Sequence, residues 1–140
     1  MKETWVIKIG SSLVTKSNTG LNTKNIKSWV AQINQIINNN INVIIVSSGA
    51  IAEGMNRLGL GKRPNSSSQL QALAAIGQMG LVKAYEVAFK KYNILTAQML
   101  LTHEDLSDRT RYLNARNTLS NLIKYNTCLL YTSPSPRDSV

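Results

Sequence analysis

The chain has 140 residues, 43% of them hydrophobic, a size and composition typical of one globular domain or part of one. Lysine and arginine outnumber aspartate and glutamate by 16 to 7, and the net charge of +9 favours an anionic partner. The basic residues are scattered and only 6% of the residues are aromatic, so we do not expect that partner to be a nucleic acid. The single cysteine, Cys128, excludes an intrachain disulfide and a multi-cysteine metal site.

The N-terminal region carries no long apolar segment. Lys2 and Glu3 precede a strand of only a few residues, so the sequence predicts no signal peptide. No run approaches the roughly 18 consecutive apolar residues of a membrane span. We therefore expect a cytosolic protein with no membrane partner.

Residues 5–12 read as a buried strand that ends in a loop rich in hydrogen-bond donors. Val6 and its apolar neighbours show no polar face, which predicts a strand covered on both sides in a parallel sheet. Lys8 interrupts this run, and its ammonium must either extend to solvent or meet an anion. Gly10 allows close approach of a ligand, and Ser11 and Ser12 add hydroxyl donors. The stretch predicts a polyphosphate loop, with an ordinary strand turn as the alternative.

A helix and a second strand follow. Asn22 or Thr23 can cap a helix whose apolar positions recur at helical spacing as far as Ile37, and the asparagines 38–40 end it. Residues 43–46 form a second β-branched run. Strand, helix and strand within about forty residues predict a right-handed βαβ unit and a parallel sheet.

The second strand also ends in a glycine-serine loop. Ser48, Gly49 and Ala50 open a short helix, whose N-terminal dipole favours a carboxylate or a phosphate. Ligands of parallel sheets bind at the carboxyl ends of the strands, so we expect this loop and the loop at Gly10 to face one ligand. A serine cap followed by a packing glycine is the alternative.

A long helix is expected after the serines 66–68. Gly77 and Gly80 lie inside it, where each costs about 1 kcal/mol relative to alanine. Close approach of another backbone would offset that cost, either from a partner subunit or from a crowded core of the same chain. A third strand over residues 94–101 and an amphipathic helix over residues 112–123 complete the expected elements.

A cluster of His103, Glu104, Asp105 and Asp108 lies between this strand and this helix. Neighbouring loop residues rarely point at one ion, and acidic residues in a loop or at a helix start explain the cluster better. We therefore predict no metal site here, and no Walker, dinucleotide-binding or zinc motif occurs elsewhere.

Five stretches, in order, resemble the start of the glutamate 5-kinase family within the amino acid kinase superfamily. They are VIKIGSSLVT, VIIVSSGAIAEGMNRLG, QALAAIGQ, QMLLT and DRTRYLNARNTL, and they lie within residues 5–126. The resemblance implies a three-layer α/β/α fold with a mainly parallel sheet, here truncated. The Gly-Ser-Ser loop favours this family over the acetylglutamate kinases, which typically have Gly-Gly.

The resemblance also implies an activity. ATP and L-glutamate, with Mg²⁺, would give γ-glutamyl phosphate and ADP in the first step of proline biosynthesis, and the enzyme would be a homo-oligomer. Lys8 would be the catalytic residue and, with Gly10 and Ser11, would hold the ATP phosphates. Ser48, Gly49 and Ala50 would hold glutamate. The alternatives are a kinase of a related substrate such as N-acetylglutamate, or an inactive fragment that binds phosphate or glutamate.

The resemblance ends near Asn126. In the family a further strand and an INEND-type segment with acidic residues follow, whereas this chain continues TCLLYTSPSPRDSV. We therefore expect residues 1–126 to be the N-terminal part of an amino acid kinase domain. Residues 127–140 are expected to be an unstructured tail foreign to the family.

Overall fold

The sheet has four parallel strands. A computed structural model describes residues 2–10, 14–16, 20–99, 107–125 and 127–132. The strands lie in the order β1 (Thr4–Ile9), β4 (Asn42–Ser47), β6 (Thr127–Thr132) and β5 (Leu95–Met99). Every neighbouring pair is parallel. Two short strands, β2 (Thr15–Lys16) and β3 (Gly20–Leu21), pair separately and antiparallel.

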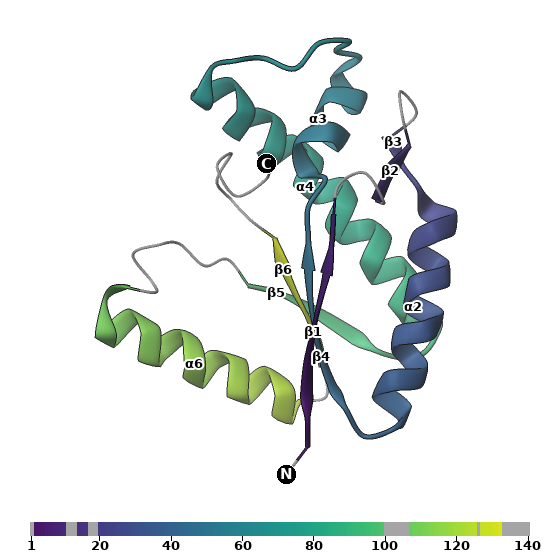
Figure 1. Cartoon of the computed structure of the whole chain (residues 1–140), viewed down its shortest axis with the longest axis vertical. Coiled ribbons are helices and arrows are strands. Elements are labelled where there is room, and N and C mark those ends of the chain that lie inside the picture. Colours follow the sequence, from purple (N-terminus) through teal and green to yellow (C-terminus); the bar gives the residue numbers. More distant parts are fainter. Residues whose placement is uncertain (1, 11–13, 17–19, 100–106, 126, 133–140) are drawn as a thin grey trace.

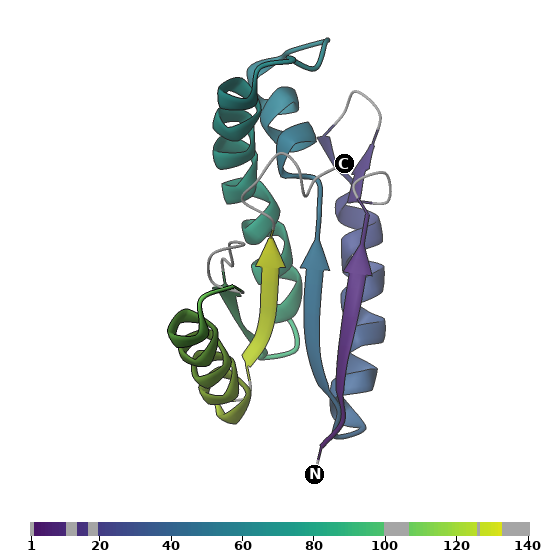
Figure 2. The same cartoon turned by 60° about the vertical axis from the view of Figure 1, so that its left-hand side comes forward.

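Helices lie on both faces of this sheet. They are α2 (Thr23–Asn38), α3 (Ala50–Leu58), α4 (Ser67–Lys90) and α6 (Arg109–Lys124). α2 and α4 cover one face and α6 lies against the other (Figure 1). Figure 2 shows β1, β4 and β6 running toward the end of the molecule where α3 begins. The expected three-layer α/β/α architecture with a parallel sheet is confirmed.

The helix boundaries follow the capping signals of the sequence. The Asn22 side chain accepts a hydrogen bond from the Asn25 N–H at 3.1 Å. α2 ends at Asn38 with Asn39 as its C-cap, before Asn40 with its φ of +66°. The Ser66 hydroxyl accepts from the Gln69 N–H at 3.5 Å at the start of α4. These caps satisfy backbone groups that have no partner inside the helix.

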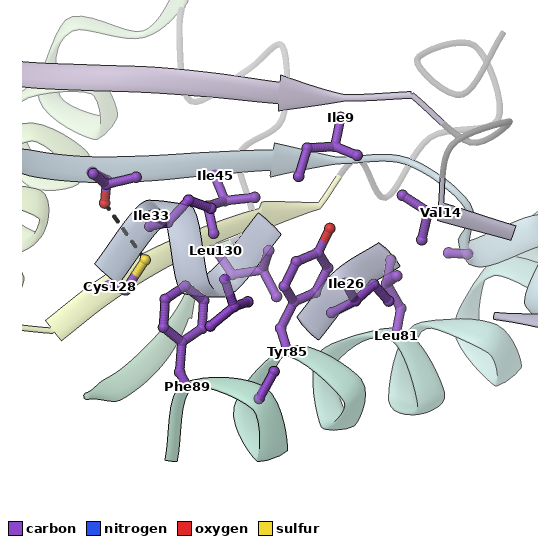
Figure 3. Close-up of a cluster of buried hydrophobic side chains, with 14 of the residues drawn as sticks. Ile9, Val14, Ile26, Ile33, Ile45, Leu81, Tyr85, Phe89, Cys128 and Leu130 are labelled. Atoms are coloured by element: carbon purple, nitrogen blue, oxygen red, sulfur yellow. Dashed lines mark hydrogen bonds between the residues drawn. The ribbon is translucent and has the colours of Figure 1, made fainter. Parts of the chain in front are cut away.

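The core lies between the sheet and the pair α2 and α4. Tyr85 and Phe89 of α4, Ile26 of α2, Ile45 of β4 and Leu130 of β6 are all at most 2% exposed. Figure 3 shows these side chains converging from α4, α2 and the sheet. Apolar burial of this kind is the main favourable term in folding, so this layer anchors the carboxyl ends of the central strands.

One face of β1 is uncovered, contrary to the sequence prediction. Ile9 points into the core, but Val6 is 64% exposed and Lys8 is also exposed. β1 is an edge strand with β4 as its single neighbour, and α6, on that face of the sheet, contacts β6. The apolar run of β1 predicted burial on both faces, but in the described part of the chain only the face that carries Ile9 is buried.

The expectation of an unstructured tail after Asn126 is wrong for residues 127–132. They form β6, which lies between β4 and β5 and pairs with both. Cys128, Leu129 and Leu130 are each at most 3% exposed. Apolar side chains in consecutive positions suit a central strand covered on both faces, so this short run is sufficient. Residues 133–140 lie outside the described residues.

α3 and α4 cross in close contact through glycines. A Cβ on Gly77 of α4 would overlap the Ala50 carbonyl oxygen, and a Cβ on Gly54 of α3 would overlap the Leu73 carbonyl oxygen. A Cβ on Gly80 would lie 2.8 Å from Arg57 Nη2. Of the two explanations for the helix glycines, the crowded core of the same chain is the one that the structure shows.

The remaining predicted elements are present with shifted ends. β5 spans Leu95–Met99, and Leu100 and Leu101 of the expected third strand lie outside the described residues. α6 begins at Arg109, and none of its residues is fully buried. Among the described residues no helix is both long and apolar enough to span a bilayer.

Candidate functional site

Lys8 lies one residue before the carboxyl end of β1. Side chains alternate along a strand, and the buried Ile9 fixes the core face, so Lys8 lies on the opposite, open face. Of the described carboxylates, Glu3 accepts a hydrogen bond from Trp5, Glu53 from Asn56 and Asp108 from the Arg111 N–H. None of them forms an ion pair with Lys8. Lys8 is thus a candidate for contact with an external anion.

The loop after β1 is described only in part. Gly10 is half-buried, and its carbonyl oxygen accepts a hydrogen bond from the Val14 N–H at 3.3 Å. A Cβ on Gly10 would have no atom within 4 Å, so there is open space beside its backbone. Ser11 and Ser12, the expected hydroxyl donors, lie outside the described residues.

Ser48 joins the end of β4 to the end of β1. Its N–H donates to the Ile9 carbonyl oxygen at 3.0 Å, and its hydroxyl donates to the same oxygen at 3.4 Å. The ends of β1 and β4 are therefore neighbours at one edge of the sheet, as the parallel topology predicts. Both Ser48 donors are committed to the Ile9 carbonyl oxygen, which leaves the amides that follow as donors for a ligand.

Gly49 makes the turn from β4 into α3. Its φ of +112° is rarely adopted by residues with a side chain. The Glu53 N–H donates to the Gly49 carbonyl oxygen at 3.0 Å, so the Ala50 amide belongs to the first turn, where helix N–H groups have no carbonyl partner within the helix. A Cβ on Gly49 would lie 3.5 Å from Val14 and Thr15. The helix N-terminus thus lies against the segment that follows the first loop.

Sequence reasoning missed a polar contact beneath this turn. The hydroxyl oxygen of Tyr85, a residue with no exposed surface, lies 3.1 Å from Ser47 Oγ. Ser47 Oγ in turn donates to the Ser48 carbonyl oxygen at 3.1 Å. Burial raises the pKa of Tyr85, so its hydroxyl stays protonated at neutral pH. The spacing of Leu81, Tyr85 and Ala88 on one helical face was the signal that could have placed the tyrosine in the core.

The described residues do not supply a magnesium site. No three histidine, cysteine, aspartate or glutamate side chains gather anywhere in the described part of the chain. Asp108 caps α6 by accepting from the Arg111 N–H at 3.1 Å, whereas His103, Glu104 and Asp105 lie outside the described residues. The donor set of the described residues therefore does not fit a hard divalent cation, which prefers several oxygen ligands.

Two cavities lie away from these loops. One, of about 280 Å³, lies between α6 and the sheet and is lined mainly by apolar side chains, among them Val46, Leu129 and Leu119. The other, of about 380 Å³, is lined by residues of α2, α3 and α4 that include Arg57 and Lys83. Neither of these two cavities is lined by Lys8, Gly10 or Ser48.

Solved structures share this fold. The chain superimposes on carbamate kinase from Giardia with a TM-score of 0.58, over 94% of this chain and 58% of that protein, at 16% sequence identity. At this identity the similarity shows the arrangement of strands and helices and nothing finer.

Sequence relatives are much closer. The chain is 53% identical over 124 residues to a protein named glutamate 5-kinase from Alcanivorax borkumensis, covering 89% of this chain and 33% of that protein. The protein of the same name from Hahella chejuensis is 56% identical over 119 residues, which is 85% of this chain and 31% of that protein. The chain thus spans about a third of the length of these relatives. The model of the Amino acid kinase family matches residues 3–133. Because that match takes in all four strands of the parallel sheet, including β6, the chain belongs to the amino acid kinase family.

Proposed function

We propose that this chain is the N-terminal part of a glutamate 5-kinase and contributes the two anion-binding loops of its active site. The observation that carries the proposal is the hydrogen bond from the Ser48 N–H to the Ile9 carbonyl, which joins the end of β1 to the residue that follows β4. The name shared by the relatives, at 53 to 56% identity, supports the choice of glutamate as substrate.

The two loops have different roles in this proposal. Lys8, Gly10 and Ser11 hold the ATP phosphates, and Lys8 neutralises charge on the transferred phosphoryl group. Ser48 with the Gly49 and Ala50 amides holds L-glutamate, whose γ-carboxylate attacks the γ-phosphorus of ATP, so that ADP leaves and γ-glutamyl phosphate forms. Such catalysis depends on positioning and on charge neutralisation, with no covalent enzyme intermediate.

The divalent ion of such a reaction would have to find its protein ligands elsewhere. The described residues gather no acidic cluster, and we assign no step to Mg²⁺ here. This favours a second candidate for the isolated chain, which is an inactive fragment that binds phosphate and glutamate. A cytosolic location and homo-oligomeric assembly belong to the proposal for the whole enzyme.

Residues 133–140 have a separate place in the proposal. They read SPSPRDSV, and the family match ends at residue 133. We propose that this segment is foreign to the family and that residues 1–132 belong to the kinase domain. Reading the source DNA beyond Thr132 tests this, and a continuation homologous to the family in the same frame as residues 133–140 would contradict it.

Binding and turnover of the 140-residue chain test the proposed site. We expect ATP and L-glutamate to bind, measured by calorimetry. Lys8→Ala should weaken ATP binding by about 10- to 150-fold, because a charge-assisted contact to phosphate contributes roughly 1.5–3 kcal/mol. Lys62→Ala, which removes an exposed lysine of the loop between α3 and α4, is the matched control and should leave ATP binding unchanged.

ADP release separates the two candidates. The fragment predicts binding without glutamate-dependent ADP release in the presence of ATP and magnesium. ADP release that requires glutamate and disappears in Lys8→Ala would show that the chain is itself the kinase. N-acetylglutamate in place of glutamate tests the related-substrate alternative. A folded chain that binds neither ATP nor L-glutamate would overturn the proposed site.

A further inference from the structure

The hydrogen bonds beneath the Gly49 turn have one consistent direction. The Ser47 hydroxyl has a single proton, and it donates that proton to the Ser48 carbonyl oxygen at 3.1 Å, because a carbonyl oxygen can only accept. Ser47 Oγ must then accept from the Tyr85 hydroxyl, 3.1 Å away. The chain of donors therefore runs from Tyr85 through Ser47 to the peptide that joins Ser48 to Gly49.

This peptide controls the direction of a candidate ligand-binding amide. The described residues contain no cis peptide bond, and in a trans peptide the C=O and N–H groups point in opposite directions. The Ser48 carbonyl points toward the buried Ser47 Oγ. The Gly49 N–H must therefore point in the opposite direction, away from Ser47 Oγ.

Both side chains are held firmly in place. Tyr85 has no exposed surface and Ser47 is 3% exposed. In Figure 3 the Tyr85 ring extends from α4 toward the sheet, with its hydroxyl oxygen at the end facing the strands. A buried hydroxyl without a partner is costly, so the tyrosine and the serine each require the other.

We propose that Tyr85 is a positioning residue of the glutamate-binding loop, which acts through Ser47 to aim the Gly49 N–H at the ligand carboxylate. This inference rests on the proposed function of Ser48, Gly49 and Ala50. Tyr85 itself touches no ligand. Its effect is on the orientation of one peptide plane, and it is confined to the glutamate side of the site, since Lys8 and Gly10 belong to the other loop.

Tyr85→Phe and Ser47→Ala test this role in the 140-residue chain. Each removes one hydroxyl and leaves the rest of the side chain in place. Amide NMR spectra of each variant should show a shifted Gly49 resonance and faster hydrogen exchange of the Ser48 N–H, which donates to Ile9. Ser47→Thr keeps a hydroxyl and should restore both signals. Tyr92→Phe, a half-buried tyrosine two residues after α4, is the matched control and should change neither.

Ligand titration adds a readout that a purely structural role would not give. In Tyr85→Phe we expect L-glutamate affinity to fall about five- to tenfold, the loss of about one hydrogen bond, while ATP affinity stays within about twofold. Equal losses for both ligands would mean general destabilisation and would overturn the positioning role.

The proposed function of the loop and the positioning role of Tyr85 can be disproved separately. If the wild-type chain does not bind L-glutamate, the proposed function of the loop fails, but the Gly49 and Ser48 signals still report whether Tyr85 orients this peptide. Unchanged signals in a folded Tyr85→Phe chain would overturn the inference even if glutamate binds. Should Tyr85→Phe not fold, Ser47→Ala and its rescue by Ser47→Thr decide the question.

Discussion

The carbonyl oxygen of Ala50 in α3 occupies the place where a side chain would begin on Gly77 of α4. A reciprocal contact between Gly54 of α3 and the Leu73 carbonyl oxygen of α4 completes the crossing. Ala50 is also the first residue of α3, next to the proposed glutamate loop. The two glycines therefore set how deeply the start of α3 sits, and with it the position of the loop.

Gly77→Ala is expected to destabilise the chain by about 1–3 kcal/mol or more, because the added methyl group meets backbone that cannot move aside. The free energy of unfolding from urea titration measures this. The sign of the change in unfolding free energy is informative, since replacing glycine with alanine in an unobstructed helix interior would stabilise the chain by about 1 kcal/mol. A stabilised Gly77→Ala variant would contradict the close crossing. Gly61→Ala is the control, because a Cβ there has no atom within 4 Å.

Gly49→Ala is expected to destabilise the chain by about 1–3 kcal/mol through backbone strain alone. Its φ of +112° is unfavourable for alanine, whereas the nearest atoms to the new Cβ, at 3.5 Å, are in ordinary contact. Comparison with Gly49→Val in urea unfolding separates strain from crowding, since valine would add steric overlap. An alanine variant as stable as the wild type would show that the turn does not require a positive φ.

The Cys128 thiol should make stability fall at high pH. Burial raises its pKa from 9.0 to about 12, so in the folded chain the thiol keeps its proton after the unfolded chain has lost it. The protonated thiol contributes its full stabilisation below about pH 9. As the pH rises from about 9 toward 12, the free energy of unfolding falls by up to about 1.4 kcal/mol per pH unit. Urea titrations at pH 8, 9 and 10 measure it.

Cys128→Ala is the control for this pH dependence, and the dependence on pH should be weaker in that variant. Burial also raises the pKa of Tyr85 above its ordinary value of 10.0, so this tyrosine too makes stability fall at high pH. That part of the pH dependence should persist in Cys128→Ala. A thiol-specific reagent adds a second readout. The folded chain should react only as fast as it unfolds, and rapid labelling of native protein at pH 8 would contradict the burial of Cys128.

Leu130→Ala tests whether β6 belongs to the folded unit. Leu130 is 2% exposed in the core, and truncation of such a side chain costs about 2–5 kcal/mol. Leu95→Ala in the neighbouring strand β5 is the matched control, because Leu95 is 71% exposed and its loss should change stability by no more than about 0.5 kcal/mol. Equal effects of the two substitutions on stability would show that residues 127–132 are not part of the folded unit.

The sequence by itself determined the elements and the edge of the sheet where the proposed loops lie. Helical spacing and capping residues located α2 and α4, and the βαβ order required the loops at Gly10 and Ser48 to meet, since parallel strands end on one side. These features depend on residues that are close in the sequence and on the right-handed βαβ connection, so the sequence alone is enough to predict them.

The tertiary structure decided three other points. β6 becomes the strand between β4 and β5, although its few apolar residues gave too short a pattern to predict this. Val6 is left exposed because an edge strand in the described chain has no cover on that face. The bond between Tyr85 and Ser47 joins residues 38 positions apart. Such contacts depend on which helix packs on which strand, and the spacing of residues within one helix or strand does not determine this.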